Sequence, residues 1–191
     1  MAGKQAKTLS ARQQAIVLRC AGKSRYPDRD RAIILLSIKA GLRAGEIAGL
    51  TWPMVLNPQG RIAHHIELHN DVAKNGSGRT IPLHPELAQA LRRLRRVHGA
   101  EGPIIRSERG DAMRPSSIVN WFAGLYRKVG FEGCSSHSGR RTFITNAARL
   151  VAKAGGSLRD VQQLAGHRSI EHTQRYIDGD TQAQRRLVNM L

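Results

Sequence analysis

The segment AIILLSIKA, residues 32–40, constrains the fold of this 191-residue chain more than any other. Its apolar side chains surround almost the whole helical circumference, which is typical of a helix buried in the centre of a domain. Pro27 suits a first helical position, Asp28 and Asp30 suit the first turn, and Gly41 follows the last apolar residue. We therefore expect a domain with a substantial core, built around a helix that begins near Pro27 and ends at Gly41.

A pair of strands is predicted beyond a short helix over residues 43–50. In the segment 61–69, apolar and polar residues alternate, and His64 shares the apolar side, as in a half-buried strand. The segment KNGSG at 74–78 has the composition of a hairpin turn, and RTIPL at 79–83 suits the returning strand. These segments predict a small antiparallel sheet inserted early in the chain.

Helices are predicted over most of the remaining chain. Ser10 and Gln13 have capping-box spacing, which indicates a helix over 11–20. Pro85 opens another helix that runs to about Val97. Further helical segments are expected near 115–128, 137–153, 158–165, 170–177 and 181–189. The expected fold class is mainly α with a small antiparallel β-sheet (α+β).

The charge of the chain points to a polyanionic partner. Lys and Arg number 31 against 14 Asp and Glu, a formal net charge of +17. DNA or RNA is the first candidate, and a ribosomal-type or membrane-surface protein is the competing interpretation. Two cysteines exclude a disulfide framework, and no apolar run approaches the ~20 residues of a membrane span. The N-terminus lacks the apolar stretch of a signal peptide, so we expect a cytoplasmic protein.

The segment SSHSGRRTF, residues 135–143, is a candidate phosphate pocket. His137 and Arg140 are three residues apart and would share one face of a helix that Ser135 or Ser136 could cap. Free N–H groups and the helix dipole favour an anion at such a first turn. The alternative for this basic pair is a solvated helix surface.

The segment LAGHRSIEHTQRY, residues 164–176, carries a second candidate pair. On one unbroken helix His167 and Tyr176 would face opposite ways. Gly166 and Ser169 indicate a break between two helices, after which the two side chains could converge. Alternatively, Tyr176 is a half-buried helix residue that donates a single hydrogen bond.

Four segments resemble a known family when they are taken in order. They are GLRAGEIAGL (41–50), KNGSGRTIPL (74–83), HSGRRTF (137–143) and LAGHRSIEHTQRY (164–176). Together they resemble the catalytic domain of the tyrosine recombinases, also called the phage integrase family, from about Pro27 to Asp178. The resemblance implies the fold of that catalytic domain. It also implies that the protein is a site-specific DNA recombinase, which cuts and rejoins strands through a 3′-phosphotyrosyl intermediate in integration, excision or inversion.

The resemblance implies that three side chains contact the scissile phosphate. Arg43 and Arg140 match the two family arginines that grip it, and His167 matches a further phosphate-contacting position. Guanidiniums keep their charge and donate paired hydrogen bonds to phosphate oxygens, which suits this role. Glu46 matches an acidic position that supports the site, and its spacing also suits an ion pair with Arg43.

Three further residues match the family's nucleophile and the groups that transfer protons. Tyr176 matches the nucleophile, Lys74 the acid that protonates the departing 5′-oxygen, and His137 a position that assists proton transfer. A free tyrosine has a pKa of ~10, so its attack at neutral pH needs nearby cations or a base. This chemistry implies no cofactor and no metal.

Other polar clusters have simpler interpretations. One face of the predicted strand carries possible metal ligands, His65, Glu67 and His69. The alternation of polar and apolar residues on a solvent-exposed strand explains them without a metal. Four arginines crowd one side of the helix over 85–97, either as a solvated face or as a phosphate contact: Arg92, Arg93, Arg95 and Arg96. Departures from the family pattern occur at Gly139, Arg141 and Arg168, and none removes a catalytic group.

The domain organisation expected from the resemblance is that of the short, single-domain family members, or else that of a truncated piece or gene remnant of a longer member. It comprises a basic N-terminal arm and helix (1–24), the catalytic domain (25–180) and a tail helix (181–191) that can exchange between protomers. The implied partners are double-stranded DNA in the bacterial nucleoid, further copies of the chain in a tetramer, and accessory DNA-bending proteins, with no membrane. The alternatives are a non-catalytic DNA-binding protein or relic on the same fold, and an RNA-associated basic protein.

Overall fold

The computed structural model describes residues 6–176, 185 and 188–190. Its central element is helix α2 (Pro27–Lys39), in which every residue from Ala32 to Ile38 is buried. Proline occupies the first turn together with Asp28 and Asp30. Gly41 follows at φ 65°, a conformation that glycine adopts without steric cost. The expected central helix is therefore confirmed at both ends.

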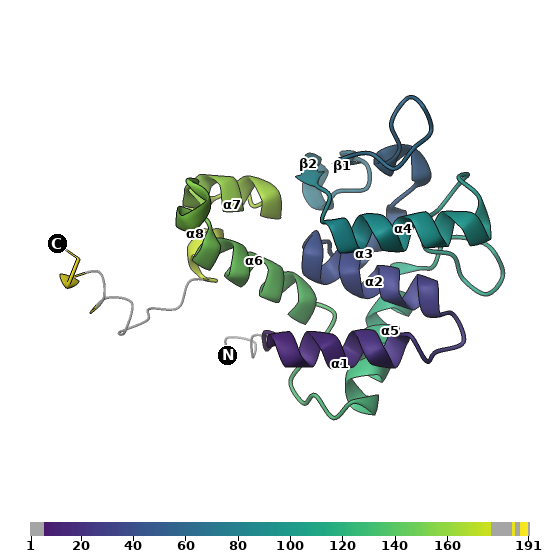
Figure 1. The fold of residues 1–191 in the computed structure, drawn as a ribbon, viewed down its shortest axis with the longest axis horizontal. Coiled ribbons are helices and arrows are strands. Elements are labelled where there is room, and N and C mark those ends of the chain that lie inside the picture. The colour runs from purple at the N-terminus through teal and green to yellow at the C-terminus, as the bar shows by residue number, and fades with distance from the viewer. Residues whose placement is uncertain (1–5, 177–184, 186–187, 191) are drawn as a thin grey trace.

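The described part of the chain has seven other helices. They are α1 (Ala11–Ala21), α3 (Ala44–Gly49), α4 (Pro85–His98), α5 (Pro115–Lys128), α6 (Ser138–Leu150), α7 (Leu158–Ala165) and α8 (Ile170–Gln174). Of these, α1, α3, α4 and α6 pack against α2, while α7 and α8 lie at the left in Figure 1. Short 3₁₀ turns occupy Trp52–Val55, Lys74–Gly76 and Ala152–Ala154. The capping box between Ser10 and Gln13 begins α1 as predicted. The predicted helix over 181–189 lies largely outside the described residues.

The sheet consists of strands β1 (His65–Leu68) and β2 (Arg79–Pro82), paired antiparallel with His65 opposite Pro82. The expected fold class, mainly α with a small antiparallel sheet, is confirmed. The first strand is shorter than predicted, and His64 is exposed rather than turned to the core. The reason is that the preceding residues bond elsewhere: the Ala63 N–H donates to the Val55 carbonyl at 2.9 Å.

The start of α6 also differs from the prediction. His137 is the N-cap, and neither Ser135 nor Ser136 caps the helix. The Ser138 N–H donates to the Ser135 carbonyl, and the Ser135 N–H donates to Ser138 Oγ at 3.0 Å. This local turn delays the helix, so His137 is exposed while Arg140 is buried.

Two apolar clusters divide the interior. The larger one joins α1 to α5 and the hairpin, and Leu9, Val17 and Ala21 bring the N-terminal segment into it. The smaller one joins α6 and α7 around Ile144 and Val161, and Tyr176, which follows α8, packs against it. In Figure 1, α6 leads from the main body to α7 and α8 at the left. The two parts meet where α6 passes α2, and the candidate site lies there.

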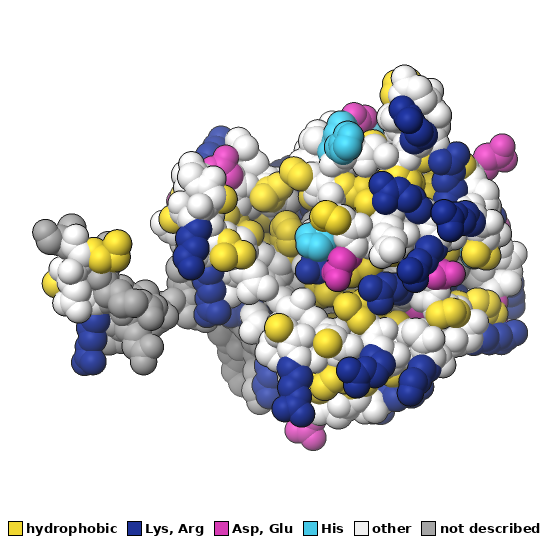
Figure 2. All heavy atoms as spheres, in the orientation of Figure 1, with side chains coloured by type: hydrophobic (Ala, Val, Ile, Leu, Met, Phe, Trp, Pro, Cys, Tyr) yellow, Lys and Arg dark blue, Asp and Glu magenta, His cyan; other side chains and the backbone are white. Residues whose placement is uncertain are grey.

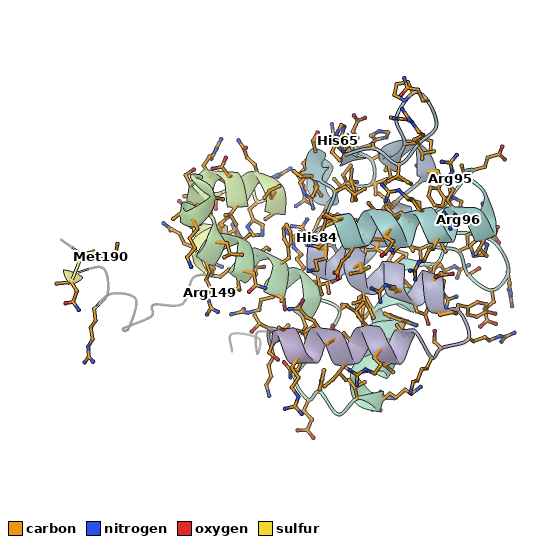
Figure 3. The ribbon with its side chains drawn as sticks, in the orientation of Figure 1. His65, His84, Arg95, Arg96, Arg149 and Met190 are labelled. Atoms are coloured by element: carbon orange, nitrogen blue, oxygen red, sulfur yellow. The ribbon has the colours of Figure 1, made fainter. Side chains whose placement is uncertain are left out.

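The surface carries the positive charge that the composition predicts. Lysine and arginine side chains are spread over the face shown in Figure 2. On α4, Arg92, Arg93 and Arg96 are exposed, and Arg95 and Arg96 are labelled in Figure 3. Within the described residues, no helix is both long enough and apolar enough to cross a membrane.

Candidate active site

Arg140 occupies the junction between the two apolar clusters. Its side chain is buried, and it donates from Nη1 to the Gly41 carbonyl and from Nη2 to the Ala165 carbonyl, each at 2.6 Å. Gly41 follows the end of α2 and Ala165 ends α7, so both carbonyls lie at negative helix ends, which favour a cation. Burial, followed by the charge of Arg43, lowers the pKa of Arg140 to about 10, which leaves the guanidinium charged at neutral pH.

Glu46 lies between two guanidiniums and is 1% exposed. Arg43 Nη1 donates to Glu46 Oε1 at 2.7 Å, and the Arg43 N–H donates to Glu46 Oε2 at 2.9 Å. Arg79 donates to both carboxylate oxygens at 3.1 Å. Burial raises the pKa of Glu46, but the hydrogen bond and charge of Arg79, with the contacts of Arg43, outweigh it and lower the pKa to about 2. The expected ion pair between Arg43 and Glu46 is confirmed.

Arg79 is a site residue that the sequence analysis did not single out. Besides its contact with Glu46, its Nε donates to the Leu164 carbonyl at 2.9 Å, which ties β2 to the end of α7. The alternation of β2 could have revealed this role of Arg79. Side chains two residues apart lie on the same side of a strand, so Arg79 shares its side with the buried Ile81. A charged residue on the inward side of a strand needs a buried partner.

The corner between α7 and α8 places His167 beside Tyr176. Gly166 ends α7 at φ 62°, so the chain breaks there as predicted. His167 Nδ1 lies 3.0 Å from the hydroxyl of the buried Thr173. The rings of His167 and Tyr176 are stacked with centroids 5.5 Å apart. The convergence that the motif predicts is therefore confirmed.

The Tyr176 ring also contacts α6. The guanidinium carbon of Arg141 lies 5.6 Å from the ring centroid, and Thr145 Oγ1 donates to the Tyr176 carbonyl at 3.4 Å. A cation over an aromatic face is attracted by the ring quadrupole. Arg141 is thus a second residue whose position became clear only in the folded chain.

The two candidate histidines share an electropositive environment. Burial, followed by the charges of Arg140 and Arg43, lowers the pKa of His167 to about 4. Partial desolvation by its neighbours, followed by the charges of Arg140, Arg43 and Lys74, also lowers the pKa of His137. Both imidazoles are therefore neutral at neutral pH and can each donate or accept a proton.

A hollow of about 550 Å³ gathers part of the predicted set. His137, Arg140 and Tyr176 line it, together with Arg141 and His172. Arg43 does not line this hollow, but its charge is among the causes that lower the pKa values of His137 and Arg140, which do.

Lys74 is exposed in the 3₁₀ turn of the hairpin. Its charge contributes to lowering the pKa of His137, so it belongs to the same electrostatic environment.

Two side chains on the polar face of β1 contact each other. His65 Nε2 lies 3.0 Å from Glu67 Oε1, and the side chains are 41% and 61% exposed. Among the residues that the structure describes, no group of three or more His, Cys, Asp or Glu could hold a metal ion.

Taken together, the site presents cationic donors around one tyrosine. Arginines held by carbonyls and by a carboxylate are preorganised before a ligand arrives, so they can bind a phosphate without rearranging. The phenol of Tyr176 can act as a nucleophile, and a neutral histidine can accept its proton.

Comparisons with known proteins identify the family of the chain. The family model described as "Phage integrase family" matches residues 7–183. The tyrosine recombinase XerC of Pelobacter propionicus is 29% identical over 155 residues, which cover 79% of this chain and 48% of the relative. XerC of Corynebacterium efficiens is 32% identical over 155 residues, with 78% and 46% covered. The chain thus spans about half the length of the curated relatives it matches.

Solved structures share the fold. The Tn1549 transposon integrase in complex with a circular intermediate DNA has a TM-score of 0.77 at 21% identity, covering 100% of this chain and 67% of the other. The XerA recombinase has a TM-score of 0.73 at 23% identity, covering 97% and 65%. Because the family model extends over almost all of the sequence, the chain belongs to the phage integrase family.

Proposed function

We propose that this chain is a tyrosine-type site-specific DNA recombinase that cuts and rejoins strands through a 3′-phosphotyrosyl intermediate. The observation that carries the proposal is the shared hollow in which Tyr176 lies with Arg140 and His137. Relatives named tyrosine recombinase, and a similarly folded integrase whose structure contains DNA, add support. The proposed substrate is double-stranded DNA.

The proposed reaction is a transesterification in which no net bond energy is lost. Tyr176 Oη attacks the scissile phosphorus and forms a P–O bond, while the bond to the 5′-oxygen breaks. The phenol proton passes to the neutral His137, and Lys74 gives a proton to the departing 5′-oxygen. A 5′-hydroxyl of a second strand reverses these steps and reseals the backbone.

Arg43, Arg140 and His167 stabilise the charge that builds on the phosphate oxygens during attack. Preorganised donors of this kind are each worth ~2.7–4 kcal/mol of transition-state stabilisation. Glu46 accepts one hydrogen bond from the Arg43 guanidinium and one from the Arg43 backbone N–H, so its role is to orient Arg43 and not to transfer a proton.

The domain boundaries and the assembly are part of this proposal. Residues 25–180 form the catalytic unit, residues 1–24 a basic arm and helix, and four protomers act together on DNA. Accessory DNA-bending proteins assist, and the working location is the bacterial nucleoid.

The tail, 181–191, exchanges between protomers in this proposal. Most of it lies outside the described residues, but the described Val188 and Met190 are 67% and 82% exposed. Apolar side chains at such exposure favour cover by a neighbour. The mass of the protein–DNA complex should be measured over a dilution series, with and without residues 181–191. We expect the protomers to assemble more weakly without these residues, and unchanged assembly would refute the exchange.

A nicked-substrate assay tests the proposed function. A pool of duplexes with randomised arms carries a nick near the centre, so that the short strand released by cleavage diffuses away and the protein stays covalently attached. We expect adducts that survive denaturing gels and yield one enriched sequence. Tyr176→Phe should abolish the adducts because the nucleophilic oxygen is absent.

The same assay separates the alternatives. A non-catalytic DNA-binding protein would enrich a sequence by binding without forming an adduct. An RNA-associated protein would prefer RNA and would be indifferent to Tyr176→Phe. Either result would refute the recombinase proposal.

A further inference from the structure

Lys74 needs a positioning contact because it is exposed on a hairpin turn. Its own segment is held from within: Ser77 Oγ donates to the Lys74 carbonyl at 2.8 Å, and the Gly78 N–H donates to Asn70 Oδ1 at 2.9 Å. These bonds shape the turn but do not fix it relative to Tyr176. A proton donor must lie within hydrogen-bond reach of the departing oxygen, so the placement of the whole turn matters.

Two arginines join the hairpin to the segment that carries His167 and Tyr176. At the base of the hairpin, Arg79 Nε donates to the Leu164 carbonyl, and β2 lies beside α7 (Figure 1). At the tip, Arg168 Nη2 donates to the Asn75 carbonyl at 2.7 Å across 93 residues of sequence. Arg168 directly follows His167, and Asn75 directly follows Lys74. The contact at the tip therefore joins the neighbours of two proposed site residues.

The backbone at the tip presents this carbonyl in an unusual conformation. Asn75, at φ 60°, has the only positive φ of a non-glycine residue in the described part of the chain. Asparagine tolerates this left-handed conformation better than most residues. In that conformation the Asn75 carbonyl accepts a charge-assisted hydrogen bond from Arg168.

We propose that Arg168 is a positioning residue that fastens the Lys74 turn to the α7–α8 corner, so that the acid and the nucleophile are placed by one connected segment. The inference rests on the proposed function and assigns a role to a position where the chain departs from the family pattern. Arg168 acts through Lys74 and does not itself touch the reacting atoms.

Arg159 provides a matched control for the charge of Arg168. Both residues line a second hollow between the hairpin and α7. Arg159 Nη1 donates to Gln162 Oε1 at 3.0 Å within α7 and does not bond to the hairpin. Arg159→Ala therefore removes one positive charge from the same hollow without releasing the turn.

A substrate with a different leaving group shows whether Arg168 positions the acid Lys74 or contributes to DNA binding. In a substrate with sulfur in place of the bridging 5′-oxygen, attack forms the tyrosyl P–O bond and breaks a P–S bond. The thiolate leaves without a proton because a thiol has a pKa of ~8.5, against ~15.7 for water as a guide to an alcohol. A defect in the acid disappears on this substrate, whereas a defect in DNA binding remains.

We expect Arg168→Ala to slow adduct formation about tenfold on the oxygen substrate and less than twofold on the sulfur substrate. Lys74→Ala should show the same pattern more strongly. Arg159→Ala should change the two rates by the same factor. Equal losses for Arg168→Ala on both substrates, or no loss on either, would overturn the proposal.

Amide hydrogen exchange provides a readout that does not depend on catalysis. We expect Arg168→Ala to speed exchange at the Gly76 and Gly78 amides severalfold and to leave those of α4 unchanged. Unchanged exchange at the turn would also overturn the proposal. If the wild-type protein forms no adduct on either substrate, the proposed function fails, and the exchange result still decides whether Arg168 fastens the turn.

Discussion

Glu46 and Arg79 form an ion pair whose two side chains are 1% and 6% exposed. Removing a charge from water costs several kcal/mol, and partners that satisfy its hydrogen-bonding atoms offset that cost. Glu46 has two such partners, because Arg43 and Arg79 both donate to it. The carboxylate therefore connects the start of α3, where Arg43 is the N-cap, to β2 and the hairpin.

Replacement of Arg79 by leucine should destabilise the fold strongly. The change leaves the buried Glu46 with one partner, and breaking a buried pair in this way costs about 3 kcal/mol or more. Urea unfolding would measure the loss. The double variant with Glu46→Gln should recover part of it, because the buried carboxylate is then gone and the Arg43 side chain, which is 21% exposed, keeps access to water. Arg12→Ala on the exposed surface of α1 should change stability by less than ~0.5 kcal/mol.

His167 makes the stability of the protein depend on pH. Burial, with the charges of Arg140 and Arg43, lowers its pKa to about 4 in the folded chain. In the unfolded chain it titrates near its ordinary pKa of about 6.5, so the unfolded state binds more protons between these values. The free energy of unfolding should therefore fall as the pH is lowered from about 6.5 to about 4.

The variant His167→Gln tests this source of pH dependence. Urea unfolding at several pH values should show a shallower fall for the variant, with the part due to His137 remaining, since its pKa is lowered in the same direction. Glu46 contributes in a separate window, because its stabilisation is lost only as the pH falls toward about 2. An identical pH dependence in the two proteins would contradict the assignment to His167.

At the scale of elements, the junction between α2 and α3 controls the site. Gly41 has φ 65°, and a side chain there would overlap the ring of Phe143 on α6. The close approach lets α6 pass near the end of α2, and the Gly41 carbonyl then holds Arg140. A glycine that ends one helix thus sets the position of a guanidinium on another.

Gly41→Ala should destabilise the protein by ~2 kcal/mol or more. The left-handed conformation costs an L-residue about 1–2 kcal/mol, and the overlap with Phe143 adds to this cost. Gly45→Ala is the matched control, since it lies exposed in α3 with nothing within 4 Å of an added Cβ. The control should be neutral or up to ~1 kcal/mol more stable in urea unfolding. Equal stability of the two variants would show that Gly41 is not required.

At the scale of the whole molecule, Arg140 connects the part built on α2 to the part that carries Tyr176. Its donors reach Gly41 in the first and Ala165 in the second. The net charge of +17 acts over the same molecule and attracts a polyanion before any specific contact forms.

DNA binding should depend steeply on salt. Each phosphate contact releases counterions, so about four contacts predict a loss of roughly a hundredfold in affinity between 50 and 200 mM salt. Fluorescence anisotropy with a duplex of arbitrary sequence measures this slope. Affinity that does not change with salt would refute a binding mode based on phosphate contacts.

Much of the fold could be predicted from the sequence because its signals are local. The proline and aspartates before α2, the capping box of α1 and the break at Gly166 all act within a few residues of their own positions. The same holds for the ion pair of Arg43 with Glu46, which are three residues apart. His64 was misplaced because Ala63 bonds to Val55, a contact outside the strand pattern.

Local sequence patterns were enough to predict the order of the helices, the hairpin, the excess of positive charge and the residue types that suit phosphate chemistry. The partners of those residues became known from the folded chain alone. Arg140 bonds to Gly41 across 99 residues, Arg79 to Glu46 across 33 and Arg168 to Asn75 across 93. Periodicity and capping report on neighbours within a turn or two, whereas these contacts depend on how closely whole helices approach, and that is set by packing.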